Sequence, residues 1–167
     1  MNNLQITNSL SNKKEIFIPI NPKKISLYVC GPTVYDDPHV GNGRALVVFD
    51  LLYRVLIELF GKDEVTYVRN ITDIDDKIIE ASKKRGIEIV ELTNEITKEF
   101  HLNCTSLFCM KPTLEPKATD HVNEMISMIE NLIKLNAAYE KNGHVYFSVS
   151  SFKSYGKLSN KKIEELK

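Results

Sequence analysis

The hydrophobic positions in the first half of the chain follow two different periods. Residues 25–30 form a short, β-rich apolar run that Gly31 and Pro32 interrupt at once, as expected for a buried strand. Between residues 45 and 59 the apolar side chains recur every three or four positions, which predicts an amphipathic helix, and Gly61 follows as its stop. Residues 65–70 predict a second strand. A strand, a helix and a strand within about 45 residues predict a βαβ unit with parallel strands.

Two further helices are predicted directly after this unit. Thr72 and Asp73 are each followed three positions later by an acid, a pattern that predicts the capped start of a helix. This helix should run to about residue 85 and stop at Gly86. The periodic apolar positions of residues 89–104 predict the next helix.

The last third of the chain reads as a connector, a helix and a hairpin. Residues 111–117 carry two prolines and predict a connector at a subdomain boundary. The helix that follows is expected to begin at Thr119 or Asp120, and the Asn-Gly pair at 142–143 predicts a hairpin turn. Residues 159–167 are charged and bring no closing element, so we expect the natural chain to continue beyond them.

Composition and charge exclude several classes of protein. The chain is 43% hydrophobic and 26% charged, as a soluble globular protein with a core would be. It has no apolar run near the ~20 residues that span a bilayer and no secretory signal, so we expect a cytoplasmic protein without a membrane partner. The 22 basic and 22 acidic residues cancel, so composition gives no sign of a nucleic-acid partner. Three cysteines argue against a disulfide framework, and Cys104 and Cys109 are interpreted as packing or surface thiols.

Polar loops follow both predicted strands of the βαβ unit. Because ligands of open parallel sheets bind beyond the carboxyl ends of the strands, residues 30–33 and 70–73 are candidate binding loops. Residues 38–43 place glycines at the start of the helix, where free backbone N–H groups accept a phosphate, and His39 and Asn42 add side-chain donors. The dinucleotide fingerprint and the P-loop pattern are both absent. Taken alone, His39 is more often a satisfied loop residue than a catalyst.

Three separated motifs together resemble one known family. The sequence reads Cys-Gly-Pro-Thr-Val-Tyr-Asp at 30–36, Pro-His-Val-Gly-Asn at 38–42 and Tyr-Val-Arg-Asn-Ile-Thr-Asp-Ile-Asp-Asp-Lys at 67–77. Their order and spacing are similar to those of the active-site half of cysteinyl-tRNA synthetases. The resemblance continues at 114–119 and 155–159, so it covers nearly the whole chain.

The resemblance implies an α/β fold and an enzymatic function. Residues 1–110 would form the N-terminal half of a Rossmann-like, parallel-sheet nucleotide-binding fold, and residues 111–167 the start of an α+β connective insertion. The full-length enzyme of this family uses ATP and Mg²⁺ to convert L-cysteine to cysteinyl-adenylate, and then transfers the cysteinyl group to tRNA(Cys) in protein synthesis. We expect the full-length form of this protein to be a monomer. The second half of the site lies beyond Lys167 in the family pattern, so residues 1–167 alone are expected to be inactive.

The resemblance also assigns roles to single residues around the nucleotide. His39-Val-Gly-Asn42 resembles the class I synthetase signature, usually His-Ile-Gly-His, in which the first and fourth residues contact the ATP phosphates and stabilise the transition state. His39 and Asn42 are therefore the expected catalytic residues, and Gly41 and Gly43 are expected to bind ATP with them. Asn42 is a neutral donor and brings no full charge.

Four further residues are expected to face the amino-acid substrate. Cys30 resembles the first ligand of the family's active-site Zn²⁺, which binds the substrate thiolate, and the remaining ligands lie outside this chain. A thiolate is a far better zinc ligand than a serine hydroxyl, so such a site would reject serine. Gly31, Thr33 and Thr72 match positions that line the substrate pocket, whereas the acids at 73, 75 and 76 are interpreted as helix caps.

Two alternative functions remain open from the sequence. A related ligase that joins cysteine to an amino sugar would carry the same activation motifs. A shortened paralogue that binds nucleotide or a partner protein without catalysis would also keep much of this pattern.

Overall fold

The computed structural model describes residues 4–162. By their contacts these residues divide into two compact units, one of residues 19–121 and one that combines residues 4–18 with 122–162. Each unit is described by itself. None of the helices among the described residues is long and apolar enough to cross a membrane.

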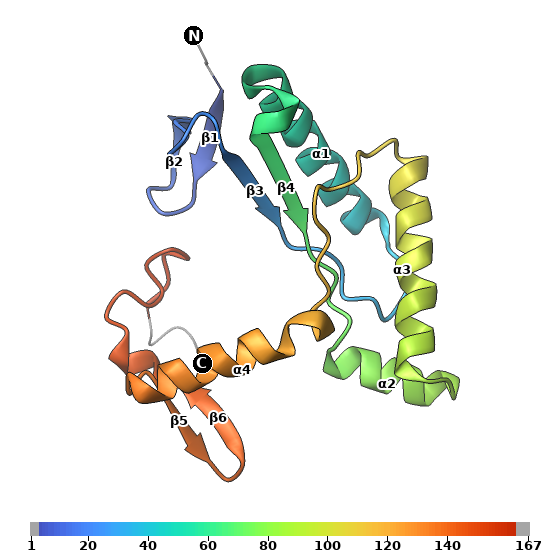
Figure 1. The fold of residues 1–167 in the computed structure, drawn as a ribbon, viewed down its shortest axis with the longest axis vertical. Helices are drawn as coiled ribbons and strands as arrows, with labels where there is room; N and C mark the ends of the chain where they lie inside the picture. Colours follow the sequence, from blue (N-terminus) through green and yellow to red (C-terminus); the bar gives the residue numbers. More distant parts are fainter. Residues whose placement is uncertain (1–3, 163–167) are drawn as a thin grey trace. The chain divides into compact units, whose positions relative to one another are not determined.

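The predicted βαβ unit is present in residues 19–121 (Figure 1). Strands β3 (Ile25–Val29) and β4 (Val65–Arg69) pair in parallel, with Ile25 opposite Val65. Helix α1 (Val40–Phe60) connects them and ends at Gly61, as predicted, after a start five residues earlier than the periodic stretch indicated. A 3₁₀ turn, Lys62–Glu64, leads into β4. The α1 side chain Tyr53 packs on the β4 side chain Tyr67, with ring centroids 4.9 Å apart, and this contact fixes the helix on the sheet.

Residues 111–118, which include the connector predicted at 111–117, lie alongside β4 and extend the sheet. Parallel bridges join Val68 to Leu114 and Ile71 to Lys117. The backbone N–H of Arg69 donates to Leu114 O at 3.1 Å, and that of Ile71 donates to Pro116 O at 2.9 Å. Proline has no N–H to return to the ladder, so pairing here is interrupted and no full strand forms. The domain division at residue 110 stays a prediction, and residues 111–118 belong by contact to the same compact unit as β3 and β4.

Helix α2 (Asp76–Arg85) begins later than the sequence indicated. The predicted cap at Thr72 or Asp73 is wrong, because Asp75 is the N-cap and its Oδ1 accepts from the Lys77 N–H at 2.9 Å. Asp73 instead accepts from the backbone N–H of Thr119 at 3.0 Å and from its hydroxyl at 2.6 Å. A carboxylate that pairs with a distant segment is not distinguishable from a local cap by spacing alone.

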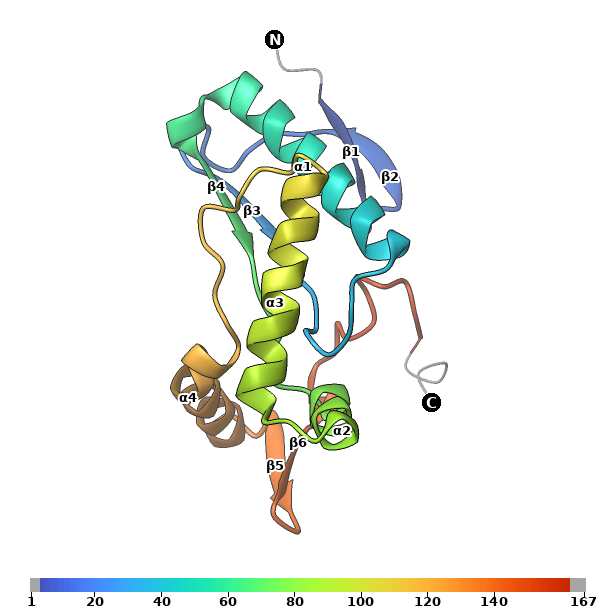
Figure 2. The ribbon, with the colours of Figure 1, turned by 90° about the vertical axis from the view of Figure 1, so that its right-hand side faces the viewer.

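The ends of α2 and the next helix agree with the prediction. Gly86 ends α2 in the left-handed conformation, with φ 66°. Helix α3 (Ile89–Ser106) extends two residues beyond the predicted end. Figure 2 shows α3 as a long, straight helix in front of the two strands.

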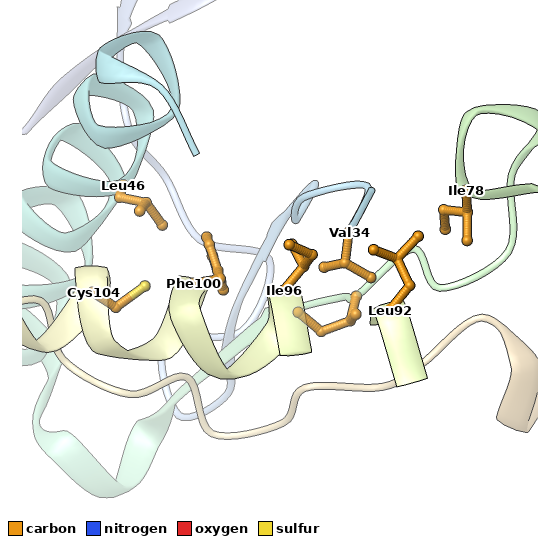
Figure 3. Close-up of a cluster of buried hydrophobic side chains, with 8 residues drawn as sticks. Val34, Leu46, Ile78, Leu92, Ile96, Phe100 and Cys104 are labelled. Atoms are coloured by element: carbon orange, nitrogen blue, oxygen red, sulfur yellow. The ribbon is translucent and has the colours of Figure 1, made fainter. Parts of the chain in front are cut away.

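A buried apolar cluster lies along one face of α3 (Figure 3). Leu92, Ile96, Phe100 and Cys104 recur at steps of four on this face. The cluster also contains Val34 from the segment after β3 and Ile71 from the segment after β4. The loops that carry the candidate site residues are therefore anchored on α3.

A buried ion pair fastens residues 111–118 to β4. The side chain of Arg69 is 3% exposed, and its Nη2 lies 2.8 Å from Glu115 Oε1. The other carboxylate oxygen of Glu115 is 2.6 Å from Nε2 of His101 on α3, and the Arg69 guanidinium lies 4.9 Å from the centroid of the Phe100 ring. Burial alone would lower the pKa of Arg69, but the hydrogen bond to Glu115 and nearby acidic groups more than offset this and raise it.

Neutralising Glu115 is expected to destabilise the protein markedly. Glu115→Gln keeps the shape of the side chain but leaves the Arg69 guanidinium without a counter-charge. The expected cost is about 3 kcal/mol in the free energy of unfolding, the lower end of the range for a buried pair, because the Glu115 side chain is 22% exposed. Urea unfolding would measure the change. Glu99→Gln is the matched control, because Glu99 is an exposed acid on α3, and it should change stability by less than ~0.5 kcal/mol. Equal effects of the two variants would contradict the role given to the ion pair.

The second unit contains the remaining predicted elements. Helix α4 (Val122–Lys134) confirms the predicted helix, but it begins at Val122, after a 3₁₀ turn at Thr119–His121, and not at Thr119 or Asp120. Strands β5 (Ala138–Lys141) and β6 (His144–Phe147) form the predicted hairpin. Its turn residues Asn142 and Gly143 have φ of 56° and 76°, as a two-residue hairpin turn requires.

The same unit contains a hairpin that the sequence did not predict. Strands β1 (Gln5–Asn8) and β2 (Lys13–Ile16) pair antiparallel. Their side chains are mostly exposed and polar, so the alternation of apolar residues that indicates a strand is missing. A last 3₁₀ turn spans Val149–Ser151.

Candidate functional site

The two loops beyond β3 and β4 continue the parallel pairing of the strands. Thr33 and Thr72 form a parallel bridge. The backbone N–H of Thr72 donates to Pro32 O at 2.9 Å, and that of Val34 donates to Thr72 O at 3.1 Å. The structure thus brings together two residues, Thr33 and Thr72, that the sequence placed in separate motifs.

A second link between these loops lies at Gly31. Its backbone N–H donates to Asn70 Oδ1 at 2.9 Å, and Asn70 Nδ2 donates to Thr72 Oγ1 at 3.1 Å. A Cβ atom added at Gly31 would lie 1.5 Å from the carbonyl oxygen of Asn70, so only glycine fits there. The sequence placed Asn70 in the candidate binding loop at 70–73 but gave this residue no role of its own. Its only signal was a polar side chain at that position.

His39 and Asn42 cap the N-terminus of α1 reciprocally. Nδ1 of His39 accepts from the Gly41 N–H at 3.0 Å, and Oδ1 of Asn42 accepts from the His39 N–H at 3.0 Å. Because Nδ1 accepts, the neutral imidazole carries its proton on Nε2. His39 is exposed and Asn42 half-buried, so the Nε2–H group and the Asn42 Nδ2 group are the donors left for a ligand.

The backbone of this turn differs from the sequence expectation. The N–H of Gly41 donates to the His39 ring, and those of Asn42 and Gly43 donate to His39 O at 2.9 and 3.3 Å. The expectation that these N–H groups are free for a phosphate is therefore wrong. The partial positive charge of the helix end remains, and no acid lies in the first turn of α1 to oppose it.

Gly41 and Gly43 are not equivalent in this turn. A Cβ at Gly41 would lie 2.7 Å from Cε1 and 2.9 Å from Nδ1 of the His39 ring, so glycine is needed for the imidazole to fold over the helix end. A Cβ at Gly43 would make only ordinary contact, 3.5 Å from a methyl group of Leu107.

Two neighbouring hollows bring most of the candidate residues together. The larger is lined by Gly31, Thr33, His39 and Asn42, with Phe100 among its walls. The smaller is lined by Cys30 as well as Gly31, Asn42 and Phe100. Gly31 and Asn42 therefore connect the predicted nucleotide and amino-acid positions. Neither Thr72 nor Gly41 lines either hollow, and Gly43 lines a separate one.

The three cysteines differ sharply in accessibility. Cys30 is exposed at the carboxyl end of β3, Cys109 is half-buried and Cys104 is buried. Burial raises the pKa of the Cys104 thiol although the Arg69 guanidinium lies nearby, and burial also raises the pKa of Cys109. Cys104 belongs to the α3 cluster, which confirms its interpretation as a packing thiol.

Cys30 does not form a metal site with its neighbours. Among residues 4–162, no three side chains of the types His, Cys, Asp and Glu are close enough together to hold a metal ion. The Cys30 thiol is exposed, so it is accessible to a ligand.

Comparison with known proteins identifies the family of this chain. Residues 16–167 match the family described as tRNA synthetases class I (C) catalytic domain, and the chain belongs to this family. It is 55% identical over 96% of its length to the cysteine--tRNA ligase of Pelagibacter ubique. It is also 53% identical over 98% of its length to the cysteine--tRNA ligases of Rickettsia prowazekii and Beijerinckia indica. The chain spans about a third (36%) of the length of each of these curated relatives.

Proposed function

We propose that a protein of the length of these relatives, containing this chain, activates L-cysteine with ATP and transfers it to tRNA(Cys). The observation that carries the proposal is that Gly31 and Asn42 line both hollows, the one that contains His39 and the one that contains Cys30. A site for adenylate formation has to hold ATP and an amino acid against each other. We further propose that the enzyme acts in the cytoplasm as a monomer.

The residues at the start of α1 would bind ATP through its phosphates. The carboxylate of cysteine attacks the α-phosphorus, an O–P bond forms, and the bond to the pyrophosphate leaving group breaks. His39 Nε2–H and Asn42 Nδ2 would donate to the charge that builds on the phosphate oxygens, and the dipole of α1 adds to this stabilisation. Gly41 and Gly43 would contribute to ATP binding because they have no side chains, so the phosphates could approach the helix end closely. Mg²⁺ would accompany ATP and share its phosphate charge.

Cys30, Gly31, Thr33 and Thr72 would bind the cysteine substrate. Zn²⁺, with Cys30 as one ligand, would supply a soft Lewis acid that distinguishes a thiolate from a hydroxyl. The parallel bridge between Thr33 and Thr72 holds Thr33, which lines the larger hollow, in a fixed position.

The sheet is compatible with one half of a Rossmann-like fold. Residues 111–118, β4 and β3 lie side by side in this order, and all pair in parallel. We propose that this is the N-terminal half of the family's nucleotide-binding fold, with the connective insertion beginning at about residue 111.

Metal content provides a test of the role of Cys30. The full-length protein is expected to hold one zinc per chain, full-length Cys30→Ser much less, and residues 1–167 little, because structural zinc sites use about four ligands. Elemental analysis after dialysis against a weak chelator would measure it, with Cys109→Ser as the matched control. One firmly held zinc in residues 1–167 would contradict a site split between this chain and a later segment.

Pyrophosphate exchange tests the function itself. The full-length protein is expected to catalyse cysteine-dependent exchange of pyrophosphate into ATP and to charge tRNA(Cys), whereas residues 1–167 are expected to do neither. The reason is that effective molarity is lost when part of the wall that positions two substrates is missing. Exchange followed by transfer to an amino sugar and not to tRNA would indicate the alternative ligase. Exchange by residues 1–167 that His39→Ala abolishes would show that the activation site is complete in this chain.

A further inference from the structure

Asn70 is a polar residue at the site to which neither the sequence motifs nor the proposed chemistry assigns a role. It is half-buried and follows the last residue of β4 directly. Both ends of its side-chain amide are used. Oδ1 accepts from the Gly31 N–H at 2.9 Å, and Nδ2 donates to Thr72 Oγ1 at 3.1 Å.

These two hydrogen bonds join residues that belong to different candidate roles. Gly31 follows Cys30 directly, so the bond to its N–H fixes the backbone that carries the Cys30 thiol. In the second bond the Thr72 hydroxyl oxygen is the acceptor, so the hydroxyl hydrogen of Thr72 points away from Asn70 and is left to donate to another group. One side chain thus controls the two loops at once.

The backbone around Asn70 leaves little freedom for this arrangement to shift. The site of a Cβ at Gly31 is occupied by the Asn70 carbonyl oxygen, 1.5 Å away, so the two strand ends are in direct contact. Ile71, the next residue, is 1% exposed and packs in the cluster along α3. Asn70 is therefore held by rigid neighbours on both sides, as a positioning residue must be.

Only an amide of this length meets both demands. It is planar and combines an acceptor with a donor, whereas aspartate offers acceptors alone and alanine offers neither. Glutamine carries the same groups one methylene farther out, so it would not present them to both partners from the same backbone position.

From this geometry we propose that Asn70 is a positioning residue for the amino-acid substrate, which sets the Cys30-Gly31 backbone and the Thr72 hydroxyl in their binding positions. The proposal rests on the proposed function, since it concerns the cysteine side of the same site. It predicts an effect on cysteine that is separate from ATP, because no hydrogen bond joins Asn70 to His39 or Asn42 in the described residues.

Steady-state kinetics of pyrophosphate exchange by the full-length protein test the proposal. Asn70→Ala is expected to raise the KM for cysteine about tenfold while the KM for ATP changes less than about twofold, in keeping with the loss of two modest hydrogen bonds. Asn70→Asp, which keeps an acceptor for the Gly31 N–H, should show a smaller rise. Asn94→Ala is the control, because Asn94 is exposed on α3 and outside both hollows.

A double-mutant cycle and hydrogen exchange separate positioning from general stability. Thr72→Val should raise the KM for cysteine less in the Asn70→Ala background than alone, because the shared bond is already lost. The Gly31 amide should exchange faster with solvent in Asn70→Ala, a readout that does not depend on activity. Equal rises of both KM values, additive effects in the cycle, or unchanged exchange at Gly31 would each overturn the proposal. Absence of pyrophosphate exchange by the wild type would instead refute the proposed function. The rate of hydrogen exchange at the Gly31 amide would still test whether Asn70 positions this backbone.

Discussion

Full-length protein with His39→Ala is expected to form cysteinyl-adenylate ~10²–10³-fold more slowly than the wild type, with a much smaller change in the affinity for ATP. Loss of one preorganised donor to the developing phosphate charge typically costs ~3–4 kcal/mol in the transition state. In the proposed mechanism the Nε2–H group of His39 would be such a donor, since the bond from the Gly41 N–H to Nδ1 fixes the orientation of the ring. Cysteine-dependent pyrophosphate exchange would measure the rate.

The same histidine is also a helix cap, so a control must separate the two roles. His39→Asn is suited to this, because asparagine is among the best N-cap residues and would keep α1 stable, whereas alanine loses ~1 kcal/mol. We expect His39→Asn to unfold at the same urea concentration as the wild type and still to lose most of its activity. A stable His39→Asn protein with the wild-type rate of pyrophosphate exchange would show that His39 acts only as a helix cap.

Gly31→Ala is expected to lower the free energy of unfolding by about 4 kcal/mol or more. The added Cβ would lie 1.5 Å from a backbone carbonyl oxygen, which cannot swing aside as a flexible side chain would. Overpacking usually costs ~1–3 kcal/mol, and a collision with backbone in a paired sheet belongs at or above the upper end of this range. Relief of the collision would separate the strand ends and break the bonds from Gly31 to Asn70 and from Thr72 to Pro32.

Gly43→Ala provides the matched control for stability. Gly43 lies within α1, where an added Cβ would make ordinary contact, so the helix should be as stable or more stable by up to ~1 kcal/mol. Urea unfolding of both variants, followed by circular dichroism, would compare them. A Gly31→Ala protein as stable as the Gly43→Ala protein would show that the strand ends are more loosely packed than the structure has them.

The local part of the fold could be predicted from the sequence. The helix α3 and the βαβ unit are long or strongly periodic, and the Asn-Gly turn of β5 and β6 has a nearly unique backbone requirement. The paired segment at 111–118 could not, because its two prolines indicate a linker and its partner β4 lies more than forty residues earlier. For the same reason the spacing predicts a helix cap at Asp73, whereas the Asp73 carboxylate accepts from Thr119.

The candidate site shows the same division. The motif identified His39 and Asn42, and the structure places them in one hollow, but their mutual capping and the use of the Gly41 N–H depend on the conformation of a single turn. The sequence placed Asn70 in a candidate binding loop but could not indicate its hydrogen bonds, because its partners Gly31 and Thr72 come from two loops that only the register of the sheet brings together.

The attachment of Glu115 and Thr119 to β4 and its loop has a consequence for synthesis on the ribosome. Arg69 and Glu115 are 46 residues apart, as are Asp73 and Thr119. At a translation rate of roughly 5–20 residues per second, β4 would wait about 2–9 seconds for the segment that covers its outer edge. During this interval one edge of β4 is unpaired, and other nascent chains could join it as an additional strand.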